Sequence, residues 1–425
     1  MVNRSIQPGF TLPASLQIPE PQEFIVGNGK KVLWLNIGTQ SIVRITLQFP
    51  AGSKYQKKLL QASSTLGLMP EGTRNFSAQQ VAEKLDFLGS QIDYSIDRDH
   101  AVISVFCLNK YVDQTLEVLK DIVLYPKFDG QEFETFRNKR KSSLAIEKAK
   151  VMYQAREVAT AAMFGKKHPY GAYAEVGDYS LLEVDDLKAF HQERFLACGG
   201  LLFVSGLVDE VLVAKVAEEL LPVVRRSDVE IPLLSFDALP KPEQIYIEKD
   251  DAVQSAVRLN RTLFARNHPD YVGMHVLTTI LGGYFGSRLM SNIREDKGYT
   301  YGIFSSVVPM QESGFLTIAT EVGCNVTLPT IVEIKREMDR LRSEKVGVEE
   351  LSLVVNYMVG EMLRMLDGPF SIVDVILDLY QSGLPVSFIN EHFAKITSIT
   401  SEELHLLAQK YLNPADFIEV VVGKR

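Results

Sequence analysis

Residues 221–244 have the sequence LPVVRRSDVEIPLLSFDALPKPEQ, which contains four prolines. Proline lacks a backbone N–H and restricts the residue before it, so this composition favours an extended linker over a helix or strand. The stretch lies near the middle of a chain of 425 residues. A chain of that length usually forms more than one domain, and we expect two domains to meet at this linker.

The segments on the two sides of the linker repeat one another. Four pairs recur in the same order at a nearly constant offset: QSIVR (40–44) with QSAVR (254–258), AVISVFCLN (101–109) with LTIATEVGC (316–324), TLEVLKDIV (115–123) with TIVEIKREM (330–338), and 187–206 with 404–423. Within each half, period-two strands alternate with helical patterns. The sequence therefore predicts an α+β fold with two homologous tandem domains, each a mainly antiparallel sheet with helices packed on one face.

The predicted domain boundaries follow from the linker and the repeat. They are an N-terminal arm at residues 1–22, a first domain at 23–225, a linker at 226–243 and a second domain at 244–425. Within the first domain, residues 41–49 predict a strand. Residues 77–89 predict a helix that Ser77 caps and Gly89 ends.

Composition excludes several classes of function. The net charge of −8 comes without any basic stripe, which argues against a nucleic-acid partner. No run of 18 apolar residues occurs, and residues 1–24 lack the apolar segment of a signal peptide, so we expect no membrane partner. The expected location is the cytoplasm, with the periplasm as the alternative if a signal peptide has been removed.

Residues 281–306, LGGYFGSRLMSNIREDKGYTYGIFSS, form the most specific pattern in the chain. A glycine-rich turn leads to Ser-Arg-Leu and then to Arg294 and Tyr301, which are seven residues apart. HPYG at 168–171 is a further mark. Together with the tandem domains, this pattern resembles the pitrilysin family of inverted-motif zinc peptidases. That family includes insulin-degrading enzyme, the mitochondrial processing peptidase and bacterial two-subunit zinc peptidases, and the resemblance covers residues 23 to 425.

The resemblance implies a zinc site that this chain has lost. Active members carry H-x-x-E-H on a first-domain helix, where the two His bind zinc and the Glu is the general base. In the family this motif runs into a Gly-Thr pair, which Gly72-Thr73 matches. Counting back from that pair places Ser63 and Gly67 at the ligand positions and Leu66 at the position of the base.

No other residues compensate for this loss in the sequence. The later Glu ligand of the family falls near Leu144, and Glu147, one turn away, cannot hold zinc alone. No two of the seven histidines are three or four residues apart, and His268 and His275 are separated by seven. We therefore predict that this chain binds no metal and no other cofactor.

The surviving Arg294 and Tyr301 suggest a role in another subunit's site. In the family, the Tyr hydroxyl donates to the oxyanion of the tetrahedral intermediate, and the Arg holds the substrate backbone or that Tyr. The two-subunit bacterial members place zinc on one chain and this pair on the other. The resemblance thus implies a non-catalytic subunit that is inactive alone, pairs with a zinc-bearing homologue and acts on peptides. Gly282 and Gly283 are candidates for backbone contact with an extended peptide.

Several alternatives remain open from the sequence. The chain could be a structural or peptide-binding scaffold with no role in hydrolysis, or an active peptidase with unrecognised zinc ligands. Without its partner, it could form a homodimer. Arg294 could pair with Glu295 or Asp296 at the surface, and Tyr301 could be a strand residue with a half-buried ring.

Overall fold

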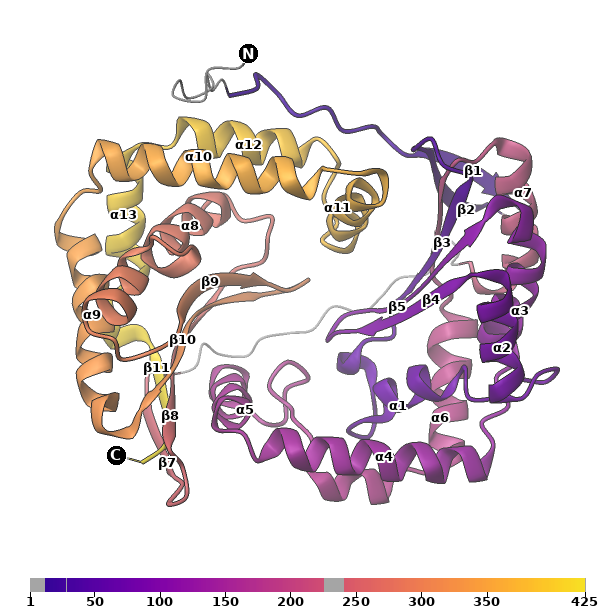
Figure 1. Cartoon of the computed structure of the whole chain (residues 1–425), viewed down its shortest axis with the longest axis horizontal. Helices are drawn as coiled ribbons and strands as arrows, with labels where there is room; N and C mark the ends of the chain where they lie inside the picture. Colours follow the sequence, from indigo (N-terminus) through magenta and orange to yellow (C-terminus); the bar gives the residue numbers. More distant parts are fainter. Residues whose placement is uncertain (1–11, 28, 225–240, 425) are drawn as a thin grey trace, which may run out of the picture.

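The computed structural model describes residues 12–27, 29–224 and 241–424, which form two similar halves that face each other (Figure 1). The strands of the first half are β1 (Gln22–Val26), β2 (Lys30–Asn36), β3 (Ile42–Phe49), β4 (Gln91–Ile96), β5 (Ala101–Leu108) and β6 (Leu201–Gly206). Its helices are α1 (Gln61–Leu68), α2 (Ala78–Leu88), α3 (Val112–Leu124), α4 (Gly130–Lys148), α5 (Val151–Phe164), α6 (Val184–Phe190) and α7 (Glu210–Glu219). The predicted linker lies outside the described residues except for 241–243.

The second half has the same mixed composition. Its strands are β7 (Gln244–Glu248), β8 (Gln254–Leu263), β9 (Ile303–Pro309), β10 (Gly314–Gly323) and β11 (Ile418–Gly423). Its helices are α8 (Tyr271–Thr278), α9 (Thr327–Ser343), α10 (Val348–Met365), α11 (Pro369–Gln381), α12 (Phe388–Ser398) and α13 (Ser401–Tyr411). In the described ranges, no helix combines the length and the apolar character that a membrane span requires.

Each half is built on one sheet. The strand order is β1-β2-β6-β3-β5-β4 in the first and β7-β11-β8-β10-β9 in the second. Neighbouring strands are antiparallel, except that β2 pairs parallel with β6 and β7 pairs parallel with β11. The prediction of an α+β fold with two tandem, mainly antiparallel sheets is confirmed.

The repeated segments of the sequence occupy equivalent places in the two sheets. β3 pairs with β5 and β6 as β8 pairs with β10 and β11. Helix α3 follows β5 as α9 follows β10, and the last repeated pair of segments ends in β6 and β11. The repeat in the sequence therefore corresponds to a repeated topology.

The outer face of each sheet packs against helices of its own half. Ile45 of β3 and Leu119 of α3 belong to the apolar core of the first half, and Leu259 of β8 and Ile334 of α9 belong to that of the second. The local signals agree with this packing. Ser77 accepts a hydrogen bond from the Gln80 N–H at the start of α2, and Gly89 ends that helix at a left-handed φ of 62°.

The inner face of each sheet carries one helix from the other half (Figure 1). On the second sheet, Ala155 of α5 joins Val420 of β11 in one buried cluster. On the first sheet, Ile376 of α11 joins Phe203 of β6. We call α5 and α11 the crossing helices, because each completes the apolar packing of the opposite half.

A buried ion cluster also connects the two halves. The Lys54 side chain is 0% exposed, and its Nζ lies 2.8 Å from Asp99 Oδ1 and 3.0 Å from Glu312 Oε1. The Tyr170 hydroxyl donates to Asp99 at 2.7 Å. Burial opposes the charge on Lys54 and on Asp99. The bonds between them nevertheless raise the pKa of Lys54 above its ordinary value and, with the Tyr170 bond, lower that of Asp99.

The described part of the predicted N-terminal arm, residues 12–21, lies against the second half before the chain enters β1 (Figure 1). The Leu16 N–H donates to Asn390 Oδ1 at 2.9 Å, and the Leu16 side chain is buried in the core of the second half. The arm is thus a further link between the halves.

Candidate functional site

The three positions where a zinc motif would stand lie on α1, where Leu66 and Gly67 follow Ser63 by about one helical turn. The Ser63 hydroxyl donates to the Leu60 carbonyl at 3.2 Å. Leu66 is 3% exposed and belongs to the apolar core of the first half. The position of the general base is thus occupied by a core residue.

An aromatic ring leaves no room for a side chain at Gly67. A Cβ atom added at Gly67 would lie 2.8 Å from two ring carbons of Phe136 on α4, far inside normal contact distance. The imidazole of a histidine is larger than a methyl group and cannot fit here unless Phe136 moves. The second ligand position therefore lacks the histidine of the motif, and Phe136 also occupies the space that a histidine side chain would need.

Replacing Gly67 by Ala is expected to lower the free energy of unfolding by about 1–3 kcal/mol, because the added methyl group overpacks against Phe136. Gly360→Ala on α10 is the matched control, because a Cβ there meets nothing within 4 Å. The control should raise the free energy of unfolding by up to about 1 kcal/mol, since Ala favours a helix. Denaturant titrations measure both effects. Equal effects at the two positions would contradict the exclusion of a side chain by Phe136.

Ser63 and Leu144 line a hollow of about 360 Å³, which we call the α1–α5 hollow. Arg98 and Arg156 also line it, so its charged lining is largely cationic. Its carboxylate, Glu157, lies 3.0 Å from the Nζ atom of Lys148. The structure therefore brings the positions expected for two zinc ligands together but surrounds them with cations, which disfavour a metal ion.

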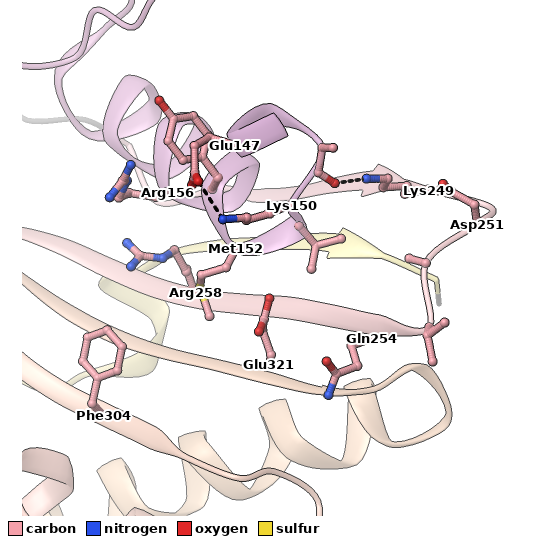
Figure 2. A pocket seen from close by; sticks show the side chains of 15 residues that line it. Glu147, Lys150, Met152, Arg156, Lys249, Asp251, Gln254, Arg258, Phe304 and Glu321 are labelled. Atoms are coloured by element: carbon pink, nitrogen blue, oxygen red, sulfur yellow. Dashed lines mark hydrogen bonds and ion pairs between the residues drawn. The ribbon is translucent and has the colours of Figure 1, made fainter. Parts of the chain in front are cut away.

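Glu147 belongs to a neighbouring pocket of about 730 Å³, the α5–β8 pocket, which lies between the start of α5 and the strands β8 and β10 (Figure 2). Its carboxylate lies 2.6 Å from Lys150 Nζ. Tyr153 and Arg156 line both the pocket and the α1–α5 hollow, so the two spaces adjoin. Glu147 thus forms an ion pair with Lys150 and does not line the α1–α5 hollow.

Among the described residues, no group of three or more His, Cys, Asp or Glu side chains is placed to hold a metal ion. Sequence spacing missed one histidine pair: His275 Nδ1 and His392 Nε2 lie 3.3 Å apart in the second half. Burial, with the charge of nearby Arg266, lowers the pKa of His275 to about 4. Burial, with the charges of His275 and Arg266, lowers the pKa of His392 to about 3. Both rings are therefore neutral at pH 7. That this chain itself binds no cofactor stays a prediction.

Arg294 and Tyr301 lie in the segment between α8 and β9. Among the described residues Arg294 forms no ion pair, and its guanidinium lies 4.7 Å from the centre of the Phe285 ring. Tyr301 is 92% exposed, and its hydroxyl has no hydrogen-bond partner in the described chain. The alternatives of a surface ion pair for Arg294 and a half-buried ring for Tyr301 are therefore wrong.

The structure does not place Arg294 and Tyr301 in the α1–α5 hollow or in the α5–β8 pocket. Tyr301 is open to solvent, whereas Arg294 is partly buried beside Phe285. Phe285 is 60% exposed, so an exposed aromatic ring accompanies the pair. Exposed aromatic and arginine side chains are enriched where proteins bind partners or ligands.

Gly282 and Gly283 end a π-helical turn, Thr279–Gly283, that follows α8. A Cβ at Gly282 would lie 2.7 Å from the backbone nitrogen of Ser305, and a Cβ at Gly283 would lie 3.2 Å from Thr279. Close packing against β9 and the preceding turn accounts for both glycines. Their contact with a peptide stays a prediction.

Comparison with known proteins agrees with this architecture. Residues 31–170 match the model of the insulinase family, peptidase family M16, and residues 182–358 match the model of the peptidase M16 inactive domain. The zinc protease YmxG of Bacillus subtilis, described as uncharacterized, is 23% identical over 360 residues, which cover 80% of this chain and 83% of that protein. The "non-peptidase homolog YmxG" of Helicobacter pylori is 19% identical over 366 residues, or 84% of this chain and 83% of that protein.

Solved structures share the whole fold. A peptidase M16 inactive domain from Pseudomonas fluorescens superposes with a TM-score of 0.86 at 22% identity, covering 96% of this chain and 99% of that one. A protease from Helicobacter pylori superposes with a TM-score of 0.85 at 16% identity, covering 96% of this chain and all of that one. The two family models together match most of the sequence, and the tandem fold agrees with them, so this chain belongs to peptidase family M16.

Proposed function

We propose that this chain is the non-catalytic subunit of a two-subunit zinc peptidase. It supplies Arg294 and Tyr301 to a zinc site on a homologous partner that carries an intact H-x-x-E-H motif. The observation that supports this most is the freedom of Tyr301. Its hydroxyl is exposed and has no partner within the described chain, while the zinc positions of the same chain are occupied by Ser63, Leu66 and Gly67.

The chemistry divides between the two subunits. The partner's H-x-x-E-H motif would hold zinc, which would supply an activated water for attack on the peptide carbonyl. The Tyr301 hydroxyl donates a hydrogen bond to the oxyanion that forms on that carbonyl oxygen. Arg294 positions the peptide backbone, or Tyr301 itself, through its planar guanidinium. Each role needs a side chain that is not already bonded inside its own subunit.

The test compares the isolated chain with a mixture. Zinc content and cleavage of a quenched-fluorescent peptide library are measured for this chain, for the H-x-x-E-H homologue from the same genome, and for both together. We expect no stoichiometric zinc and no cleavage by this chain alone, and a large gain in the homologue's activity on mixing. Stoichiometric zinc in the isolated chain contradicts the proposal. An unchanged homologue also contradicts it and favours a scaffold role.

A further inference from the structure

The two crossing helices meet the two sheets at equivalent positions with different charges. On the first sheet, Arg44 of β3 faces Asp374, the sixth residue of α11, with Nη1 and Oδ1 2.6 Å apart. In the internal repeat, Arg44 of QSIVR corresponds to Arg258 of QSAVR on β8. The sixth residue of α5 is Arg156. The crossing helix on the second sheet therefore carries an arginine at the position where the crossing helix on the first sheet carries a carboxylate.

On the first sheet, the protein itself supplies most of the ion-pair and hydrogen-bond partners of Arg44. Besides Asp374, Arg44 bonds the Phe370 carbonyl through Nη1 and the Ser104 hydroxyl through Nη2, both at 3.4 Å. Its buried Nε atom lacks a partner within the described ranges. The hydroxyls of Thr46 and Ser104 lie 2.9 Å apart and bond each other. Arg44 and Asp374 thus form a structural pair.

On the second sheet the equivalent groups are not satisfied. Arg258 is only 8% exposed, yet within the described chain it forms no ion pair or side-chain hydrogen bond, and its Nε is buried without a partner. Asn260 is fully buried, and among the described residues neither its amide atoms nor the opposite Thr317 hydroxyl has a hydrogen-bond partner. Burial, with the nearby charge of Arg156, lowers the pKa of Arg258 to about 10, so it stays cationic at pH 7. A buried charge without a counter-charge is unfavourable.

Both arginines open into the α5–β8 pocket from opposite walls, and Figure 2 shows their guanidinium groups pointing to the same side of it. Three carboxylates of the described residues line this pocket: Glu147, Asp251 and Glu321. Glu147 is paired with Lys150, and Figure 2 shows Asp251 at the opposite end of the pocket from the two arginines. Glu321 forms no ion pair with either arginine among the described residues, and Figure 2 shows its carboxylate away from both guanidinium groups. The two cations therefore face space that can accept an anion.

We propose that Arg156 and Arg258 bind the C-terminal carboxylate of a peptide in the α5–β8 pocket. A planar guanidinium matches a carboxylate in two-point hydrogen bonding, and a second guanidinium from the opposite wall can donate further hydrogen bonds to the same carboxylate. Met152 and Phe304 also line the pocket and offer apolar contact to the terminal side chain. Glu321 in the same lining favours an anion of single charge over a phosphate.

This site gives the bound peptide a direction. Since Arg156 lines both the pocket and the α1–α5 hollow, a peptide anchored by its carboxylate extends from one space into the other. The inference rests on the proposed function only in taking peptides as the ligand. It concerns the isolated chain and does not involve Arg294, Tyr301 or a zinc-bearing partner.

The experiment measures binding of fluorescein-labelled hexapeptides ending in Phe to the full chain by fluorescence anisotropy. One peptide has a free C-terminal carboxylate, a second has a C-terminal amide, and a third has the amide and an internal Glu. We expect the free acid to bind about tenfold or more tightly than both amides, because only it offers a terminal charge to the arginines. Inorganic phosphate at millimolar concentration should compete poorly.

Variants assign the effect to the two arginines. Arg258→Gln should weaken binding of the free acid by about tenfold or more and leave the amide unchanged, without lowering the melting temperature, because an unpaired buried charge is removed. Arg156→Asp should also abolish the preference for the free acid, and it should raise the melting temperature by supplying the missing carboxylate. Arg364→Gln on α10, whose side chain is 71% exposed, is the control for net charge and should change nothing.

Two kinds of result overturn the proposal. One is equal binding of acid and amide, or a preference that survives both Arg258→Gln and Arg156→Asp. The other is binding that only the internal-Glu peptide or phosphate shows, because the site would then take a different anion. None of these results affects the activity expected on mixing with the zinc-bearing homologue, so failure here is distinct from failure of the proposed function.

Discussion

Replacing Lys54 by Met is expected to lower the free energy of unfolding by about 3–5 kcal/mol, because the buried carboxylates of Asp99 and Glu312 would lose the cation that both contact. The Lys54 side chain is fully buried, and the side chains of Asp99 and Glu312 are 9% and 7% exposed. Met fills a similar volume, so the effect reports the lost charge and hydrogen bonds more than a cavity. Urea titration should show a lower midpoint at an unchanged slope.

Lys57→Met is the matched control for this change. Lys57 Nζ and Glu193 Oε2 lie 2.8 Å apart, the same separation as Lys54 Nζ and Asp99 Oδ1, but the two side chains are 72% and 40% exposed. An exposed pair of this kind contributes at most about 1 kcal/mol. A similar loss for both variants would contradict the view that the buried cluster of Lys54 holds the two halves together.

The tandem fold could be predicted from the sequence because its signals are local or repetitive. Ser77 and Gly89 mark the ends of α2 through hydrogen bonding and backbone geometry that depend on neighbouring residues only. The recurrence of QSIVR as QSAVR revealed that β3 and β8 are equivalent. Neither inference needed knowledge of contacts between distant residues.

The crossing helices could not be predicted in this way. An apolar helix face shows that a helix is covered but not which sheet covers it, so α5 and α11 were indistinguishable from helices that pack within their own half. Contacts between distant residues were missed for the same reason. Phe136 against Gly67 and His275 beside His392 join residues far apart in the chain, and no sequence periodicity relates them.

Only part of the candidate site could be predicted from the sequence. Family resemblance identified Ser63, Leu66 and Gly67 as lost positions and Arg294 and Tyr301 as retained ones. The exposure of Tyr301, and the finding that Arg294 has no ion pair in the described chain, required the structure, since both depend on how the segment between α8 and β9 folds. Arg258 ends the repeated segment QSAVR, but neither Arg258 nor Arg156 belongs to a binding motif in the sequence. Their relation appeared only when the two sheets were compared.

Removal of the Tyr301 hydroxyl is the second change with a large expected effect. Tyr301→Phe keeps the exposed ring but removes the donor to the oxyanion, an interaction that exists only in the transition state. Loss of one such donor lowers the rate by roughly 10²–10³-fold. Because substrate binding does not use it, kcat and kcat/KM should fall equally and KM should stay the same.

Tyr299→Phe is the control within the same loop. Tyr299 packs partly buried against the core of the second half, so it is not available to a partner's site to the same degree. Its variant should keep kcat/KM within about twofold, which lies inside the range of ordinary structural effects. The partner's zinc content and the affinity of the two subunits are measured beside each variant, so that a loss of rate is not confused with a loss of assembly.

The decisive measurement is kcat/KM of the mixed peptidase with wild-type chain, Tyr301→Phe and Tyr299→Phe, at equal zinc content and full complex formation. The proposed role predicts a fall of roughly 10²–10³-fold for Tyr301→Phe alone. An unchanged kcat/KM for Tyr301→Phe, or an equal fall for both variants, would contradict the claim that this chain contributes Tyr301 to the partner's zinc site.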